Sequence, residues 1–174
     1  MTNKVIHTVA RSFVASGAIA IRFNFRGVGL SEGVHDGGAG ETEDVIGLVN
    51  WARERSPRLP LWLSGFSFGA WIALRAQVSA HPSLLVTVAP PVGRWDFSTI
   101  DPPSCPWLVI QGSKDELVDA VAVEGWLFSL KDRSVVPPRF FLLPEADHFF
   151  HARLHDVRDA VSQFVSDYAE ERSE

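Results

Sequence analysis

Residues 60–69 read Pro-Leu-Trp-Leu-Ser-Gly-Phe-Ser-Phe-Gly, and they predict a buried strand that runs almost directly into a helix. The first half is a short apolar run of strand length, and residues 68–80 carry apolar side chains at helical spacing. Only a Gly-x-Ser-x-Gly pentapeptide lies between them, so we expect Gly65 and Gly69 to leave room where the two backbones pass each other. Ser67 then stands at the tip of a strained turn, with its hydroxyl exposed at the positive end of the helix.

The composition is that of an ordinary globular domain. The chain has 174 residues, of which 46% are hydrophobic and 21% charged, and its formal net charge is −5. We therefore interpret residues 1–174 as a single domain with a substantial core. A mildly acidic chain without a basic run gives no reason to expect a nucleic acid or a membrane as partner. Cys105 is the only cysteine, which excludes an internal disulfide. The first thirty residues lack an uninterrupted apolar core, so we expect a cytoplasmic protein without a signal peptide.

Helices and strands are expected to alternate along the chain. Amphipathic spacing predicts helices at residues 4–16, 41–55, 68–80, 120–130 and 149–168. Short apolar runs predict strands at residues 18–25, 60–64, 84–89, 107–111 and 139–143. Such alternation predicts an α/β fold with a mostly parallel sheet and helices on both faces. Ligands of such sheets bind at the carboxyl ends of the strands, so the chemistry is expected on the loops that leave them.

Two of these loops carry groups that suit the activation of a serine. Residues 112–118 read Gly-Ser-Lys-Asp-Glu-Leu-Val, and residues 144–150 read Pro-Glu-Ala-Asp-His-Phe-Phe. A serine hydroxyl is a poor nucleophile until an oriented base removes its proton. Histidine is the natural base, because its pKa lies near neutrality.

These stretches resemble the three triad loops of the α/β-hydrolase superfamily. The matching stretches are Phe66-Ser67-Phe68, Asp115 within Gly-x-x-Asp-x-x-Val, and Ala146-Asp147-His148-Phe149-Phe150. Their order, Ser then Asp then His, is the one that this fold uses. Residues 22–31 similarly resemble the loop after the strand that precedes the nucleophile. The likeness is strongest to small, lidless bacterial serine hydrolases and carboxylesterases, and it extends from about Thr2 to the last helix.

The resemblance implies a serine hydrolase that cleaves small-molecule esters through an acyl-enzyme. Ser67 is then the nucleophile, and His148 is the general base and later the general acid. Asp115 holds the imidazole in the correct tautomer, and the backbone N–H of Phe68 is one oxyanion donor.

Several of these assignments have alternatives. Asp115 could instead cap the following helix, although Asp119 is a better cap candidate. His151 and His155 are the other histidines of this region, and both are interpreted as surface residues of the last helix. Asp147 is interpreted as a residue that shapes the loop.

The substrate site is expected to be shallow and open. Only residues 90–105 connect two core strands where larger relatives insert a lid. Arg94 on this connection could meet an acidic substrate, although we expect a salt bridge to Asp96 or Asp101. Four aromatic side chains are candidates for the substrate pocket, with core packing as the alternative: Phe66, Trp95, Phe97 and Phe149. No cofactor or metal is implied, since the chain has no clustered His and Cys ligand set and no phosphate-binding glycine loop.

The sequence departs from the family at its beginning. Relatives have strands before the first helix, and the loop that leaves the last of them supplies the second oxyanion N–H. We therefore interpret the fold as N-terminally truncated, without the strand that would lie between residues 18–25 and 60–64. The alternative function is a catalytically impaired or non-catalytic remnant with an incomplete oxyanion hole. Self-association that completes the sheet would be one way to compensate, and the oligomeric state is left open.

Overall fold

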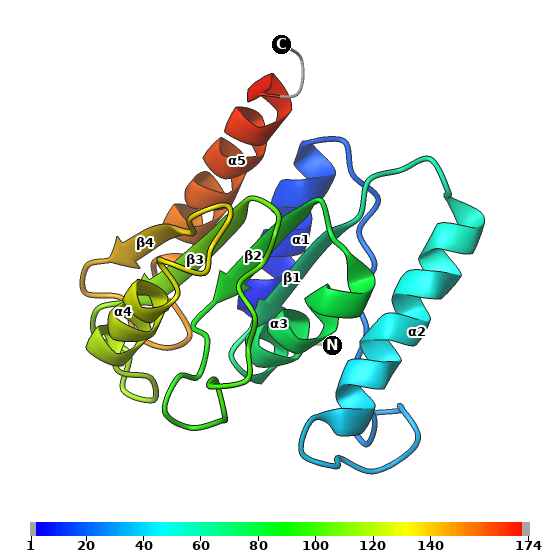
Figure 1. Ribbon diagram of the computed structural model, residues 1–174, viewed down its shortest axis with the longest axis horizontal. Helices are drawn as coiled ribbons and strands as arrows, with labels where there is room; N and C mark the ends of the chain where they lie inside the picture. The colour runs from blue at the N-terminus through cyan, green and yellow to red at the C-terminus, as the bar shows by residue number, and fades with distance from the viewer. Residues whose placement is uncertain (1–2, 172–174) are drawn as a thin grey trace.

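The computed structural model describes residues 3–171 and has the α/β architecture expected from the sequence (Figure 1). Met1 and Thr2, where the resemblance is expected to begin, lie outside the described residues. The described part contains α1 (Lys4–Ala15), α2 (Ala39–Arg55), β1 (Trp62–Phe66), α3 (Phe68–Ala80), β2 (Leu84–Val88), β3 (Trp107–Gly112), α4 (Ala120–Ser129), β4 (Arg139–Leu143) and α5 (Leu154–Glu171). No helix within it is both long enough and apolar enough to cross a membrane.

The four strands form one parallel sheet in the order β1-β2-β3-β4. Helices α1 and α5 cover one face, and α2, α3 and α4 cover the other (Figure 1). The inner strands β2 and β3 are buried along their whole length, as is typical of parallel strands covered on both faces. The connection at residues 89–106 between them contains no helix. The predicted fold class is therefore confirmed, including the absence of a helical lid at this place.

Helix α3 is the most deeply buried helix next to the site. Eight of its thirteen residues are buried, because the helix packs against β1, β2 and α2 at once. A helix that is apolar on most of its surface has few alternative ways to pack. The N-terminus of α3 is therefore held in a fixed place at the carboxyl edge of the sheet.

One predicted strand is wrong. Residues 18–25 form no strand, and Ile19 and Ile21 are 74% and 45% exposed. Within residues 3–171, β1 is an edge strand whose outer side has no strand partner. An apolar run becomes a strand only where a neighbouring strand takes up its backbone N–H and C=O groups. The rings of Phe23 and Phe25 pack instead against the apolar cluster around α3.

The last helix also differs from the prediction, because it begins at Leu154 and not at residue 149. Phe150 and Ala152 have φ values of 54° and 57°, so the chain turns twice before the helix can begin. Phe150 is fully buried in this turn. The hydrophobic pattern extends across the turn, which is why spacing alone placed the helix too early.

The turn between β1 and α3 requires a glycine at only one of its two ends. A Cβ atom at Gly65 would lie 2.0 Å from the carbonyl oxygen of Gly69, so no side chain fits there. A Cβ atom at Gly69 would meet only the Phe25 ring, at 3.8 Å, which is ordinary van der Waals contact. The expectation that both glycines leave necessary room is therefore right for Gly65 and wrong for Gly69.

This asymmetry predicts opposite effects for the same substitution. Gly65→Ala should lower the free energy of unfolding by at least about 1–3 kcal/mol, because the added methyl group collides with backbone atoms. Gly69→Ala should leave that free energy unchanged or raise it by up to about 1 kcal/mol, because alanine is the better helix former. Urea unfolding of both variants measures the difference. Equal stabilities of the two variants would contradict this account of the turn.

Candidate active site

Ser67 occupies a strained turn between β1 and α3. Its φ of 53° and ψ of −123° lie in a region that residues with a side chain rarely adopt, at a cost of about 1–3 kcal/mol. Two backbone hydrogen bonds hold it there: Ser67 N donates to Val88 O at 2.9 Å, and Ala70 N donates to Ser67 O at 2.8 Å. The turn leaves the hydroxyl outside both the strand ladder and the helix, where it can meet other groups.

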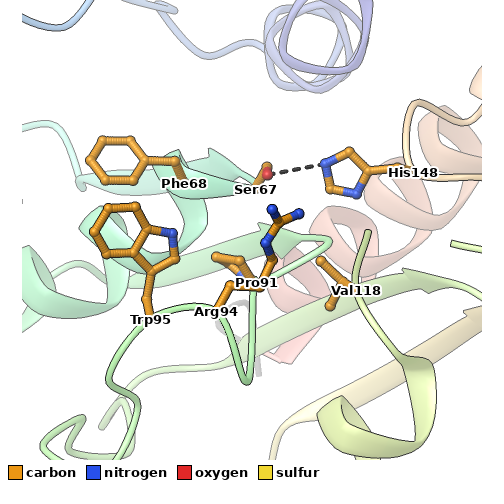
Figure 2. A pocket seen from close by; sticks show the side chains of 7 residues that line it. All are labelled: Ser67, Phe68, Pro91, Arg94, Trp95, Val118 and His148. Atoms are coloured by element: carbon orange, nitrogen blue, oxygen red, sulfur yellow. Dashed lines mark hydrogen bonds between the residues drawn. The ribbon is translucent and has the colours of Figure 1, made fainter. Parts of the chain in front are cut away.

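His148 joins Ser67 to Asp115. Its Nε2 lies 3.0 Å from Ser67 Oγ, and its Nδ1 lies 2.8 Å from Asp115 Oδ2 (Figure 2 shows the first contact). His148 is 2% exposed, and the Asp115 side chain is completely buried. The structure thus brings together the three residues that the sequence singled out, in a chain of contacts from hydroxyl to imidazole to carboxylate.

The Asp115 carboxylate is fixed by several donors. Its Oδ1 accepts hydrogen bonds from the N–H groups of Leu117 and Val118, and its Oδ2 also accepts one from Gln111 Nε2. Burial alone would raise the pKa of Asp115, but the hydrogen bonds from His148 and the two backbone N–H groups lower it below 3.8. The carboxylate is therefore ionised at neutral pH and accepts a hydrogen from Nδ1. With a hydrogen on Nδ1, the lone pair on Nε2 of the imidazole faces Ser67.

The alternative residues have other partners. His151 is mostly exposed and lies 2.7 Å from Asp147, which also accepts a hydrogen bond from the His151 N–H. Asp147 therefore shapes the loop, as expected. His155 lies beside Asp156 at the surface. Asp119 caps α4, because its Oδ1 accepts a hydrogen bond from Val121 N.

The loops that carry Asp115 and His148 are fastened to each other. A Cβ atom at Gly112 would lie 2.4 Å from Ala146 O, so only glycine allows the second loop to pass this closely. Lys114 N then donates to Ala146 O at 3.0 Å. These contacts fix the separation of the two loops, and with it the contact between carboxylate and imidazole.

A cavity of about 260 Å³ opens beside Ser67 (Figure 2). Its walls come from the turn after β1, the connection after β2 and the two fastened loops. The residues that line it are Ser67, Phe68, Pro91, Arg94, Trp95, Val118 and His148. No motif in the sequence singles out Pro91, and Val118 appears there only as the last position of the Gly-x-x-Asp-x-x-Val motif. The three-dimensional arrangement places both in the cavity wall.

Of the four aromatic candidates for the pocket, only Trp95 lines the cavity. Phe66 is buried, with its ring centroid 5.0 Å from that of His148. The Phe149 ring packs edge-on against the same imidazole, with ring centroids 5.1 Å apart, and also against the ring of Phe66, at 5.9 Å. Phe97 is buried against Trp126 and belongs to the core.

Neither a metal site nor a second strong nucleophile accompanies this arrangement in residues 3–171. No group of three or more His, Cys, Asp or Glu side chains there is placed to hold a metal ion. Cys105 is buried, and burial raises the pKa of its thiol to about 11. The thiolate needed for nucleophilic attack is therefore scarce at neutral pH.

A buried carboxylate supports the loop beside the cavity. The Glu41 side chain is completely buried in the first turn of α2, where it accepts hydrogen bonds from Gly38 N at 2.8 Å and Asp36 N at 3.2 Å. Its Oε1 also contacts Nδ1 of His35, whose ring packs edge-on against Phe68. Glu41 thus holds the segment that braces the Phe68 side of the cavity. An acidic residue in the first turn of the predicted helix was the only sequence signal for this role.

The Glu41 contacts predict a pH-dependent stability. Burial on its own would raise the pKa of Glu41, but the hydrogen bonds from the loop lower it from 4.5 to about 2. A lowered folded-state pKa stabilises the fold above pH 4.5, and this contribution is lost as the pH falls towards about 2. Glu41→Gln should therefore be less stable than the parent protein at neutral pH, and the difference should shrink over this interval.

Urea unfolding across this pH range measures the difference. The exposed Glu43→Gln variant, on the same helix, is the control and should show little change at any pH. A Glu41→Gln effect that stays constant from neutral pH to the acid limit would contradict the proposed role of the ionised carboxylate.

Comparisons with known proteins agree with this architecture. Residues 2–101 match the family described as X-Pro dipeptidyl-peptidase (S15 family). The XC6422 protein of Xanthomonas campestris, described as a serine hydrolase without a lid, is 45% identical with a TM-score of 0.90, over 97% of this chain and 75% of that one. An uncharacterized protein of Rickettsia prowazekii is 33% identical over 95% of this chain and 72% of its own length. The esterase PF2001 of Pyrococcus furiosus has a TM-score of 0.79 at 18% identity, over 95% of this chain and 76% of that one, which is a likeness of fold alone.

The chain therefore belongs to the α/β-hydrolase superfamily and carries the domain of its S15 family. Within the superfamily it is a homologue of the small serine hydrolases without a lid. This confirms the family that the sequence motifs predicted.

Proposed function

We propose that the protein is a serine hydrolase that cleaves small esters through an acyl-enzyme on Ser67. The observation that carries the proposal is the pair of contacts made by His148, at 3.0 Å to Ser67 Oγ and 2.8 Å to Asp115 Oδ2. A hydroxyl, an imidazole and a buried carboxylate in this arrangement supply a nucleophile, a base and an orienting group.

The first half of the proposed reaction forms the acyl-enzyme. His148 Nε2 takes the Ser67 proton as Oγ attacks the ester carbonyl, and Asp115 stabilises the resulting imidazolium. The carbonyl oxygen becomes an oxyanion that accepts a hydrogen bond from the Phe68 N–H, which has no acceptor within the first turn of α3. The imidazolium then gives its proton to the departing alcohol as the ester C–O bond breaks.

The second half repeats these steps with water. His148 removes a proton from a water molecule that attacks the acyl carbon, and the Phe68 N–H again receives the oxyanion. The carboxylic acid leaves as Ser67 Oγ regains a proton from His148.

The cavity favours small substrates. Its volume of about 260 Å³ is below the range that is usual for drug-sized ligands. The connection at residues 89–106 adds no helix above Ser67, which leaves the approach to the hydroxyl open. We therefore expect short esters to be better substrates than long-chain lipids.

Removal of dipeptides, as in the name of the S15 family, has less support in this site. A dipeptidyl-peptidase substrate presents a positively charged amino terminus near the reacting carbonyl, and an acidic side chain is the natural group to receive it. In the part of the chain that the structure describes, the cavity lining contains Arg94 and no acidic side chain. If the kcat/KM for Ala-Pro 4-nitroanilide exceeded that for every short ester, the protein would be a peptidase and our proposal would be wrong.

A catalytically impaired hydrolase is the second candidate. It is favoured by the unpaired outer side of β1 within residues 3–171, and by the assignment of only one oxyanion donor, the Phe68 N–H. Lack of one such donor costs roughly 10²–10³ in rate. Absence of measurable turnover with short esters, together with normal folding and a reactive Ser67, would favour this candidate.

The three residues should act as one unit. His148→Ala and Asp115→Asn should each lower kcat for 4-nitrophenyl acetate by roughly 10⁴-fold, and the double variant should be little worse than either single one. The reason is that each substitution, on its own, already prevents the activation of Ser67. Steady-state kinetics on variants whose folding is checked by circular dichroism provide the measurement.

The neighbouring His151 and Asp147 provide matched controls, because they form a similar contact at the surface. His151→Ala and Asp147→Asn should keep kcat within a few-fold of the parent value. Full activity in His148→Ala, or an equal loss in His151→Ala, would show that the base is misassigned.

A further inference from the structure

Among the described residues that line the cavity, Arg94 alone carries a permanent charge. Figure 2 shows its guanidinium pointing toward the space beside Ser67 and His148. Within residues 3–171, the guanidinium has no hydrogen bond, ion pair or ring contact with another side chain. A cation with five hydrogen-bond donors is thus presented to whatever enters the cavity.

The acidic residues expected to pair with Arg94 are engaged elsewhere. Asp96 Oδ1 accepts hydrogen bonds from the backbone N–H and the hydroxyl of Ser98, at 2.9 and 2.6 Å. Asp101 Oδ1 lies 2.8 Å from a guanidinium nitrogen of Arg133. The expected salt bridge of Arg94 is therefore wrong, and its charge is not neutralised by either neighbour.

The loop that carries Arg94 is firmly held. Arg94 N donates to Pro91 O at 3.1 Å, which closes a tight turn after β2. The next residue, Trp95, stacks on Trp71 of α3 with ring centroids 4.7 Å apart, and Trp71 Nε1 donates to Asp96 O. A side chain on such a loop loses little backbone freedom on binding a ligand, which favours recognition.

The charges around the cavity favour an anion. No acidic residue within 3–171 lines the cavity, and the buried Asp115 carboxylate lies behind the imidazole of His148. The N-terminus of α3 adds partial positive charge beside Ser67. A guanidinium offers two parallel N–H donors that match the two oxygens of a carboxylate.

We propose that Arg94 binds a carboxylate on the substrate, so that the site acts on small esters that carry a carboxylate a few bonds from the scissile carbonyl. This inference rests on the proposed esterase function and narrows its substrate class. The Arg94 guanidinium holds the carboxylate while the ester carbonyl lies between Ser67 Oγ and the Phe68 N–H. The dimensions of the cavity restrict such substrates to half-esters of short dicarboxylic acids and to acyl esters of small hydroxy acids.

Two pairs of esters that differ only in charge test the proposal. Ethyl hydrogen glutarate is compared with ethyl 4-carbamoylbutanoate, and 4-acetoxybenzoate with 4-acetoxybenzamide. The first pair places the carboxylate on the acyl side, and the second on the alcohol side. At low ionic strength, the anionic member of at least one pair should have roughly tenfold or greater kcat/KM, and Arg94→Gln should abolish this preference.

Two further variants separate charge from position. Arg94→Lys should retain part of the preference, because an ammonium keeps the charge but lacks the paired donors. Arg58→Gln removes the same charge from the turn before β1, at the amino ends of the strands and away from the cavity. This variant should retain the full preference. Equal kcat/KM values within both pairs, or a preference that survives Arg94→Gln, would overturn the proposal.

A binding measurement keeps this test independent of turnover. Glutarate and neutral glutaramide are titrated while tryptophan fluorescence is recorded, since Trp95 lines the cavity. Glutarate should bind more tightly than glutaramide, and Arg94→Gln should weaken its binding by roughly tenfold or more. Selective glutarate binding without ester hydrolysis would refute the proposed function and leave the anion site standing. Equal binding of glutarate and glutaramide would refute the anion site itself.

Discussion

The backbone of β1 passes the first turn of α3 so closely that Gly65 faces the Gly69 carbonyl with no room for a methyl group. Ser67 lies within this turn in a strained conformation, with a φ of 53° and a ψ of −123°. The turn also places the start of a buried helix directly beside the hydroxyl. The strain is maintained by the packing of α3, which has eight buried residues and little freedom to move away.

The loops that carry Asp115 and His148 reach Ser67 because β1 to β4 are parallel and end at one edge of the sheet. Gly112 at the end of β3 has the same role as Gly65 near the end of β1. In both places the absence of a side chain allows a second segment of backbone to pass closely. His148 can then contact Ser67 and Asp115 at once. Arg94 enters the same cavity from the connection after β2. The segments that follow β1, β2, β3 and β4 therefore each supply part of the cavity wall.

Much of this arrangement can be read from the sequence, because it depends on local patterns. Hydrophobic spacing predicts the five helices of residues 3–171 and four of the five expected strands, with shifts at their ends. The turn with Ser67 and the loops with Asp115 and His148 follow predicted strands, and their motifs resemble the triad loops of the α/β-hydrolase superfamily. The parallel topology alone was enough to bring them to one edge.

The remaining features depend on contacts that no local pattern contains. The apolar run at residues 18–25 matched a strand, but strand formation requires a neighbour, and β1 offers it no ladder in the described part of the chain. Phe97 and Trp95 are close in sequence, yet one packs in the core and the other lines the cavity. The pairing of Arg94 depended on which partners Asp96 and Asp101 had already taken, and that is settled only by the folded chain.

The central claim is that Ser67 is the residue acylated by substrate and that His148 activates it. Mass-spectrometric mapping of the adduct formed by a fluorophosphonate probe tests this claim most directly, because the probe forms a stable bond to an activated serine. The account predicts one adduct, on Ser67, that is absent in Ser67→Ala and forms much more slowly in His148→Ala. An adduct on any other residue, or labelling of Ser67 at an undiminished rate in His148→Ala, would contradict it.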